Sequence, residues 1–257
     1  MQMQDFLSVD SLSMRYGGIL ALDSVSFRVS KGEVFSLIGP NGAGKTTLFN
    51  CISRFSTPHS GRISFCGHDL LRLRPEEICK LGVTRTFQNI ELFAKLNVLQ
   101  NILIGLYSHF DYNLMDSFLR TRKMRNEEKR YRAQVEEIME FLGLTAYRTQ
   151  KVSSLSYGLQ KLVEVGRALA TNPRLILLDE PASGMNQEEK QNLNRIILDS
   201  KAAFDATVLL VEHDMDFVMR ISDRICVLNF GVKIAEGPPE EIGKHPGVIE
   251  AYLGAGA

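Results

Sequence analysis

The chain has 257 residues, of which 44% are hydrophobic and 23% charged, and its 30 Lys and Arg balance its 30 Asp and Glu. These proportions are those of an ordinary globular protein, so they exclude whole-chain disorder, collagen-like structure and low complexity. The zero formal net charge argues against a dedicated nucleic-acid-binding protein, because neutralising phosphates requires an excess of basic residues.

Targeting and membrane-spanning segments are not evident. Residues 1–5 lack the basic and apolar regions of a secretory signal, and no window approaches the roughly 18 apolar residues of a membrane span. The four cysteines, Cys51, Cys66, Cys79 and Cys226, lack metal-ligand spacing, so we expect small buried side chains without disulfides. We predict a cytoplasmic chain, held at a membrane at most by a partner.

The first part of the chain is strand-like. Residues 7–9 and 25–29 alternate apolar and polar side chains, as half-exposed strands do. Residues 34–38 form a mostly apolar run, which predicts a buried parallel strand. A glycine-rich loop and a helical pattern over residues 47–52 follow.

From about residue 98 to residue 142 the periodicity becomes helical. Val135, Ile138, Met139 and Leu142 follow the i, i+3, i+4, i+7 spacing of one helix face, and Gly143 is placed to end that helix. A second helix is expected over residues 159–170, ending before Asn172 and Pro173.

The remaining pattern alternates between strands and helices. Residues 175–178 and 207–211 predict two more buried strands, separated by a helix over about residues 187–204. Residues 224–228 and 232–236 flank Asn-Phe-Gly, which predicts a hairpin. The order indicates an α/β body interrupted by a helical insertion.

The insertion carries a basic stretch. Positions 119–132 contain seven basic residues and only two acidic ones. The basic residues are Arg120, Arg122, Lys123, Arg125, Lys129, Arg130 and Arg132. A solvated helix face is the simpler interpretation, and proximity to anionic lipid head groups is the alternative.

A phosphate-binding motif follows the strand at 34–38. It comprises Gly39, Pro40, Asn41, Gly42, Ala43, Gly44, Lys45 and Thr46, and matches G-x-x-x-x-G-K-[ST]. Glycines let successive backbone N–H groups converge on phosphate oxygens, and the following helix N-terminus adds partial positive charge. We expect Lys45 to reach the β- and γ-phosphates of a nucleotide, Thr46 to offer its hydroxyl to Mg²⁺, and Thr47 to contact phosphate.

Two acidic residues come directly after the strand at 175–178. The carboxyl ends of parallel strands are where open α/β sheets bind ligands. We therefore predict that Asp179 holds magnesium, usually through water, and that Glu180 polarises an attacking water molecule. His213 follows the strand at 207–211 and is a candidate contact for the γ-phosphate, although a lone histidine is more often structural.

Together these motifs resemble the ATP-binding cassette (ABC) ATPases. The segment Leu-Ser-Tyr-Gly-Leu-Gln at 155–160 is similar to the family signature L-S-G-G-Q, and residues 182–186 stand where the D-loop should be. The resemblance implies that Tyr16 stacks on adenine, that Gln88 is the Q-loop glutamine near Mg²⁺ and γ-phosphate, and that Ser156 and Gly158 face the ATP of a second subunit.

The same resemblance implies a P-loop NTPase (RecA-like) core with an antiparallel β subdomain and an inserted helical subdomain. We expect residues 1–93 and 162–240 to form the core, residues 94–161 the helical subdomain and residues 241–257 a C-terminal tail. The expected activity is ATP hydrolysis with Mg²⁺, in which Glu180 and His213 act on the γ-phosphate and Thr46, Gln88 and Asp179 hold the metal.

A narrower similarity points to the LivG-type ATP-binding subunits of bacterial branched-chain amino acid importers. It rests on Gly-Val-Thr-Arg-Thr-Phe-Gln at 82–88, the L-S-Y-G form of the signature, Glu-His-Asp-Met at 212–215 and Ala-Tyr-Leu-Gly at 251–254. It implies a second ATP-binding subunit arranged head to tail, two integral membrane permease subunits, an extracytoplasmic solute-binding protein, and a place on the cytoplasmic face of the inner membrane.

Three positions depart from the family pattern. Leu159 replaces the signature Gln, Asn186 replaces the D-loop Asp, and Gln187 stands where this subfamily commonly has Pro. From these we expect weaker hydrogen bonding between subunits and an altered rate, with the reaction retained. The apolar residues Ile90, Leu92 and Phe93 after Gln88 have two open interpretations, a core contact or a groove for a helix of the membrane subunit; the family resemblance favours the groove.

Three other kinds of ABC protein are alternatives to an importer subunit. Soluble ATPases of translation carry two cassettes and those of repair carry a long coiled coil, neither of which fits a chain of 257 residues without repeats or heptads. An exporter ATPase of the lipopolysaccharide type has a similar C-terminus and stays open. A regulator without hydrolysis is opposed by the presence of Glu180 and His213. The transported solute and the identity of the partner cassette are not encoded in this chain.

Overall fold

The computed structural model describes residues 6–106 and 122–253. Its strands are β1 (Leu7–Tyr16), β2 (Ile19–Val29), β3 (Val34–Ile38), β4 (Ser60–Phe65), β5 (His68–Asp69), β6 (Val83–Arg85), β7 (Leu175–Asp179), β8 (Thr207–Val211), β9 (Arg224–Asn229) and β10 (Val232–Gly237). Its α-helices are α1 (Lys45–Ile52), α2 (Pro75–Lys80), α3 (Val98–Ile104), α5 (Arg122–Phe141), α6 (Tyr157–Ala170), α7 (Gln187–Phe204), α8 (Met215–Ile221), α9 (Pro239–Ile242) and α10 (Pro246–Leu253).

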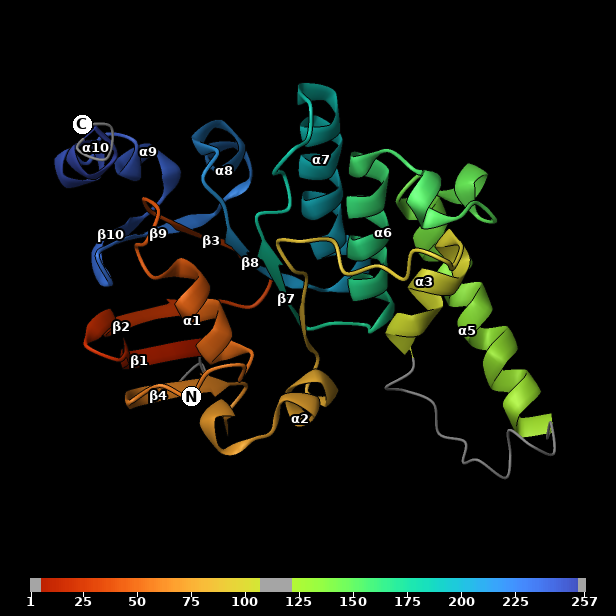
Figure 1. Ribbon diagram of the computed structural model, residues 1–257, viewed down its shortest axis with the longest axis horizontal. Helices are drawn as coiled ribbons and strands as arrows, with labels where there is room; N and C mark the ends of the chain where they lie inside the picture. Colours follow the sequence, from red (N-terminus) through yellow and green to blue (C-terminus); the bar gives the residue numbers. More distant parts are fainter. Residues whose placement is uncertain (1–5, 107–121, 254–257) are drawn as a thin grey trace.

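Two sheets form the framework of the molecule. Strands β2, β1, β4 and β5 make an antiparallel sheet in that order, and β10, β9, β3, β8, β7 and β6 make a second sheet in which all neighbouring pairs except β9 and β10 are parallel. Figure 1 shows α1 between the two sheets, with α6, α7 and α8 on the opposite side of the larger sheet. The expected α/β class, with an antiparallel β sheet beside a parallel core, is confirmed.

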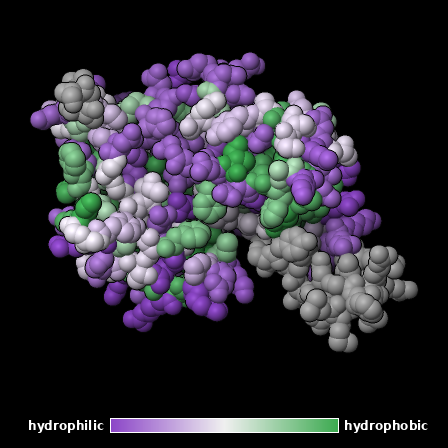
Figure 2. Space-filling view, in the orientation of Figure 1, coloured by the Kyte–Doolittle hydropathy of each residue, from purple (hydrophilic) through white to green (hydrophobic). Residues whose placement is uncertain are grey.

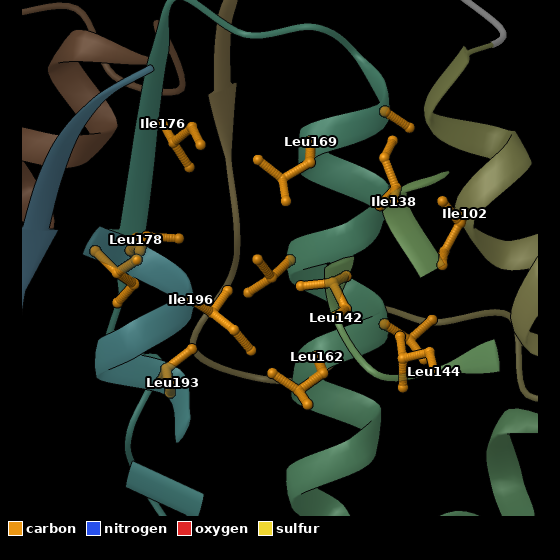
Figure 3. Close-up of a cluster of buried hydrophobic side chains, with 14 of the residues drawn as sticks. Ile102, Ile138, Leu142, Leu144, Leu162, Leu169, Ile176, Leu178, Leu193 and Ile196 are labelled. Atoms are coloured by element: carbon orange, nitrogen blue, oxygen red, sulfur yellow. The ribbon is translucent and has the colours of Figure 1, made fainter. Parts of the chain in front are cut away.

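The buried strands of the larger sheet present a different core on each face. Leu175 and Leu177 of β7 pack with α1 and the smaller sheet, whereas Ile176 and Leu178 pack with α3, α5, α6 and α7. Because side chains alternate along a strand, a continuous apolar run supplies both cores at once. Figure 3 shows the second core, where Leu162 and Leu169 of α6 lie among side chains of β7, α7 and α5.

The helical segments follow the predicted faces. Val135, Ile138, Met139 and Leu142 are all buried in the core that contains α6. The helix α5 ends at Phe141, and Gly143 adopts a φ of +70°, which a glycine tolerates without steric cost, so the predicted end of the helix is confirmed. Of the basic stretch, Lys129, Arg130 and Arg132 are exposed on α5, whereas Arg120 lies outside the described residues, as do residues 1–5.

The cysteine prediction is only partly correct. All four thiols are free, and Cys51 and Cys226 are buried; burial raises their pKa to about 11 and about 12. Cys66 is only half-buried and Cys79 is exposed, which corrects the expectation that all four are buried. Cys79 belongs to the short helix α2, whose inward position is occupied by Ile78.

The predicted hairpin is confirmed and lies next to the glycine-rich loop. Strands β9 and β10 pair through Asn229 and Val232, and the two turn residues, Phe230 and Gly231, have positive φ values of 46° and 80°, as in a type I′ turn. The Gly231 N–H donates to the Ala43 carbonyl at 3.1 Å. The turn is therefore tied to the loop between β3 and α1.

The proposed subdomain limits stay a prediction. The helix α6 runs without interruption across the expected limit at 161–162 and contributes to the same apolar core as α3, α5 and α7. Within the described ranges, no helix has both the length and the apolar content needed to cross a membrane.

Candidate functional site

The glycine-rich loop at 39–46 connects the end of β3 to the start of α1. Gly39 has a φ of +151°, and any Cβ there would collide with the carbonyl oxygen of Leu228. Gly44 precedes the helix with a φ of +101°, and a Cβ there would lie 2.6 Å from the carbonyl oxygen of Ala21. The neighbouring β9 and β2 backbones thus leave room only for glycine, and the loop keeps the open backbone that phosphate binding requires.

Lys45 is buried within this loop. Its Nζ donates to the carbonyl oxygens of Gly39 at 2.7 Å and Pro40 at 2.9 Å. Burial lowers the pKa of Lys45, while the nearby carboxylates of Glu180 and Asp179 partly offset that effect. The ammonium group therefore lies between the loop and two acidic side chains, where it can meet an anionic ligand.

Three of the predicted residues converge at the carboxyl ends of the parallel strands. Gln88 follows β6, Glu180 follows β7 and His213 follows β8. The Gln88 Nε2 donates to Glu180 Oε2 at 3.0 Å, and the His213 Nδ1 lies 3.8 Å from the same oxygen. The structure thus brings together residues that are far apart in the sequence around one carboxylate.

The backbone at Glu180 has an unusual conformation. Its φ is +47°, in the left-handed region that L-residues seldom occupy, and its N–H donates to the Val211 carbonyl at 2.9 Å. Such conformations cost free energy and are concentrated at functional sites. The strain supports assigning a role to this side chain.

Asp179 makes an ion pair that the sequence did not predict. Arg85, at the end of β6, donates from Nη2 to Asp179 Oδ2 at 2.8 Å, and both side chains are almost completely buried. A buried carboxylate needs such a compensating charge. Arg85, on the neighbouring strand β6, supplies that charge to Asp179.

A cleft of about 420 Å³ lies over the glycine-rich loop. The glycine-rich loop, the start of α1, β2, the β9–β10 turn and the residues Gln88 and Glu180 after β6 and β7 line it. The lining residues are Ile19, Leu20, Ala21, Asn41, Gly42, Ala43, Gly44, Lys45, Thr46, Thr47, Gln88, Glu180 and Phe230. Tyr16 is not among them; it is exposed, and its hydroxyl lies 3.1 Å from the Ser56 hydroxyl. Phe230, which the sequence did not single out, adds an aromatic ring to the lining, and the stacking of Tyr16 on adenine stays a prediction.

Ser156 and Gly158 lie at the start of α6 and are not among the residues that line this cleft. Ser156 caps the helix, with its Oγ accepting from the Leu159 N–H at 3.4 Å. Gly158 is buried against α7, where a Cβ would collide with the carboxylate of Glu189. The signature segment therefore forms a second surface, separate from the glycine-rich loop of the same chain.

Leu159 and Asn186, which depart from the family pattern, each make structural contacts within the chain. Leu159 packs partly into the core shared by α3, α5 and α6. Asn186 caps α7 through a reciprocal pair, accepting from the Glu189 N–H at 2.9 Å while Glu189 accepts from the Asn186 N–H at 3.0 Å. These contacts show what the two residues do within the chain; the effect of the substitutions on subunit contacts and rate stays a prediction.

A buried ion pair on α6 holds the backbone next to Gln88. Lys161 and Glu164 are each 2% exposed and lie 3.5 Å apart. Lys161 donates to the carbonyls of Phe87 at 3.2 Å and Gln88 at 2.9 Å, and the Phe87 N–H donates to Glu164 at 3.1 Å. Charged residues with i, i+3 spacing after the signature are the one sequence signal that could have suggested this contact.

Glu212 is a further buried acid, to which the sequence motifs assigned no role. Its carboxylate accepts from the N–H of Ala182 at 2.8 Å and of His213 at 3.0 Å. Burial raises the pKa of Glu212, and the backbone donors only partly counteract this. Glu212 thus connects the chain after Glu180 to the backbone of His213.

Comparisons with known proteins agree with this geometry. Residues 22–183 match the model of the ABC transporter family, and residues 232–257 match the branched-chain amino acid ATP-binding cassette transporter model. The chain is 40% identical to the high-affinity branched-chain amino acid transport ATP-binding protein BraF of Pseudomonas aeruginosa, over 96% of this chain and 97% of that protein. It is also 40% identical to the corresponding protein LivG of Escherichia coli K12, over 98% of both.

Solved structures give the same result. The ADP conformation of an ATP-binding cassette of an ABC transporter superposes with a TM-score of 0.85 at 35% identity, covering 98% of this chain and 99% of that one. A nucleotide-free cassette gives 0.84 at 34% identity, with 97% and 99% coverage. With its glycine-rich loop, strand-end carboxylates and signature helix in place, the chain belongs to the ABC transporter family as one of its ATP-binding cassettes.

Proposed function

We propose that this chain is the ATP-binding and ATP-hydrolysing subunit that powers an ABC importer of branched-chain amino acids or related small polar solutes. The observation that carries the hydrolytic part is the convergence of Gln88 and His213 on Glu180 beside the glycine-rich loop. The transported class rests on the names of the relatives that match nearly the full chain.

The cleft suits a nucleoside triphosphate. Phosphate oxygens would accept from the N–H groups of the loop and the first turn of α1, and Lys45 would leave the carbonyls of Gly39 and Pro40 to meet the β- and γ-phosphates. Thr47 would add a hydroxyl contact. We place the base on the side of the loop where Tyr16 and β2 lie.

Glu180 is the proposed general base. Its carboxylate would orient a water molecule for in-line attack on the γ-phosphorus and accept the proton, while the bond to the β–γ bridging oxygen breaks. The imidazole of His213 would donate to a γ-phosphate oxygen. Gln88 holds Oε2 of Glu180, leaving the other carboxylate oxygen for the water.

The residues present fit a magnesium site. Mg²⁺ is usually bound by one or two protein oxygens together with substrate phosphates. The described residues contain no cluster of three or more His, Cys, Asp or Glu, so a site built largely by the protein is not expected within them. Thr46, Asp179 through water, and Gln88 would hold the ion, which neutralises phosphate charge when bound.

The hydrolytic site requires a second cassette in this proposal. Ser156 and Gly158 stand apart from the cleft of their own chain, at the N-terminus of a 14-residue helix whose dipole favours an anion. A head-to-tail partner would place this helix end over the γ-phosphate. Two ATP molecules would then hold the pair together until hydrolysis releases it.

The transport machinery would consist of other subunits. Two permease subunits would hold this chain at the cytoplasmic face of the inner membrane, and an extracytoplasmic binding protein would deliver the solute; nucleic acid has no part in it. Phe93 is 54% exposed in the segment after Gln88, and Leu92 packs partly into the core. Figure 2 shows hydrophobic residues gathered on the side of the molecule where α3 and α6 lie, which suits a docking surface for a permease helix.

Replacing Glu180 by Gln tests the hydrolytic role. A missing general base lowers turnover by roughly 100- to 10,000-fold. Glu180→Gln should retain ATP binding, lose most steady-state hydrolysis and accumulate an ATP-bound pair in gel filtration, whereas Glu188→Gln, on the exposed first turn of α7, should behave as wild type. Near wild-type hydrolysis by Glu180→Gln would remove Glu180 from this role.

The transported class needs a separate measurement. Deleting the gene for this chain in the native organism should abolish high-affinity uptake of leucine, isoleucine and valine. The wild-type gene should restore uptake, whereas the gene carrying Glu180→Gln should not. Unchanged uptake, together with co-purification of lipopolysaccharide-export subunits, would favour the exporter alternative.

A further inference from the structure

We propose that Arg85 is a positioning residue that fixes the carboxylate of Asp179 in the orientation needed to hold the divalent cation of the bound nucleotide. This inference rests on the proposed function, because it assigns Asp179 to the cation. It assigns a role to a side chain that lies outside the nucleotide-binding motifs.

Arg85 joins three elements around the strand-end carboxylate. From the end of β6 its Nη2 donates to Asp179 Oδ2 at the end of β7, at 2.8 Å. Its Nη1 donates to α1, reaching Asn50 Oδ1 at 2.7 Å, and to Ser53 Oγ just after that helix, at 2.9 Å. Nη2 is thus bound to Asp179, and Nη1 is bound to Asn50 and Ser53.

Aromatic rings further restrict the guanidinium. Its central carbon lies 5.6 Å from the ring centroid of Phe49, 5.8 Å from that of Phe55 and 5.4 Å from that of Phe87. The Nε atom is buried without a hydrogen-bond partner. The side chain therefore keeps a position that leaves one of its own donors unsatisfied while it serves Asp179, Asn50 and Ser53.

The contact distinguishes the two oxygens of Asp179. Among the described residues, the Asp179 carboxylate accepts a hydrogen bond from Arg85 alone, and only through Oδ2. Within the part of the chain that the structure describes, Oδ1 has no protein donor, as an oxygen that serves a cation or its bound water requires. The backbone N–H of Asp179 lies 3.4 Å from Thr86 Oγ1, so the main chain is also held from β6.

Lysine would not reproduce this arrangement. Its ammonium could pair with the buried carboxylate but could not reach Oδ2, Asn50 and Ser53 with one planar fork. Residues that orient a metal ligand typically change metal affinity by about 10- to 100-fold when replaced. Arg85→Lys should therefore keep the buried charge pair yet weaken cation binding.

The experiment measures cation binding without turnover. The full-length protein is loaded with the non-hydrolysable analogue AMP-PNP and titrated with Mn²⁺, whose free concentration is read from its EPR signal. We expect Arg85→Lys to need about tenfold more Mn²⁺ for half-saturation. In EDTA, its affinity for a fluorescent ATP analogue should equal that of wild type, because the glycine-rich loop is intact.

Two further variants calibrate the result. Asp179→Asn should shift the Mn²⁺ titration in the same direction. Arg174→Lys should not shift it, since Arg174 precedes β7 at the opposite end and lies over the rings of Phe6 and Phe65. If Arg85→Lys does not fold, the double variant Asn50→Ala with Ser53→Ala removes the acceptors of Nη1, leaves the charges in place and should still weaken Mn²⁺ binding.

The outcomes separate the two levels of inference. A folded Arg85→Lys, or the folded double variant in its place, with wild-type Mn²⁺ half-saturation would show that Arg85 is only structural. Loss of nucleotide affinity in EDTA would equally overturn the proposal, because the defect would then lie in the loop. If Asp179→Asn leaves the Mn²⁺ titration unchanged, Asp179 does not hold the cation, and this inference fails while the proposed ATPase function stands. If the wild type does not bind nucleotide, the proposed function itself fails and this inference fails with it.

Discussion

Gln88 donates a hydrogen bond from Nε2 to Oε2 of Glu180 at 3.0 Å, across the carboxyl ends of two neighbouring parallel strands. The backbone of Gln88 is in turn held by Lys161 of α6, which donates to its carbonyl at 2.9 Å. Two direct contacts therefore connect the helix that carries the signature segment to the carboxylate assigned as the general base. A shift of α6 relative to β7 has to change one of these contacts.

Removing the Gln88 amide should slow hydrolysis without weakening nucleotide binding. A hydrogen bond to a charged group contributes roughly 1.5–3 kcal/mol, so a carboxylate that loses this donor becomes less well oriented. We expect Gln88→Ala to lower kcat about tenfold, with the Kd for ATP in EDTA unchanged. Steady-state kinetics and equilibrium binding check this, with Asn89→Ala, at the exposed next position, as the control. A wild-type kcat would show that Glu180 is oriented by other contacts.

The residues of the site were predictable where a motif places them at a strand end. Glu180 and His213 follow strands recognisable from uninterrupted apolar runs, and parallel strands bring their carboxyl ends to one edge. Arg85 could not be found in this way, because its role depends on the buried carboxylate that it meets on a neighbouring strand, and the sequence around Arg85 carries no sign of that contact. For Lys161 and Glu164, the i, i+3 spacing suggests a pair on one helix but does not show that the pair contacts the backbone of Phe87 and Gln88.

The strands, too, were predictable from the sequence only in part. The bounds of β3 and β8 are those expected, because each strand is buried along its whole length. The alternation at residues 7–9 extends into a ten-residue strand, β1, whose pairing with β2 shifts register after Val9, Leu12 and Met14. Each shift breaks the period of two on which the prediction relies. The antiparallel sheet was thus only partly visible in the sequence.

The buried ion pair of Lys161 and Glu164 should stabilise the fold more than either charge does without its partner. Removing one partner leaves an uncompensated buried charge, at a cost of about 3–5 kcal/mol. We expect Lys161→Met and Glu164→Gln each to lower the unfolding free energy by about this amount, and the double variant to lower it by less than their sum. Urea unfolding of the four proteins measures the coupling, with the exposed Lys151→Met as control. Strict additivity would mean that the two charges do not support each other.

Glu212 should make the stability of the protein depend on pH in a defined direction. Its pKa is raised above the ordinary value of 4.5, chiefly by burial, so the folded state binds this proton more tightly than the unfolded state does. The contribution of Glu212 is therefore most favourable below about pH 4.5, falls as pH rises through the raised pKa, and stays reduced above it. Because Gln at position 212 cannot ionise, Glu212→Gln does not lose stability in this way as the pH rises.

The expected result is a difference that changes with pH. Gln at position 212 replaces one acceptor by an amide donor facing a backbone N–H, which adds a penalty independent of pH. The unfolding free energy of Glu212→Gln minus that of wild type should therefore rise from about pH 4.5 toward neutrality. Urea unfolding at a series of pH values measures it, and the exposed Glu240→Gln should give a flat difference. A flat or falling difference for Glu212→Gln would contradict the assignment.

Phe230 should contribute to nucleotide affinity through the base. Its ring is 84% exposed and lines the cleft, on a turn held to the glycine-rich loop by the hydrogen bond from Gly231 to Ala43. Contact between an aromatic side chain and a base contributes roughly 1–3 kcal/mol, and at the low end of that range Phe230→Ala should raise the Kd for ATP about fivefold. Calorimetric titration in EDTA measures this, with Val232→Ala, exposed on β10 outside the cleft, as the matched control. Because inorganic triphosphate has no base, its affinity should be the same in Phe230→Ala and wild type; an equal loss for both ligands would show that the substitution disturbs the phosphate loop.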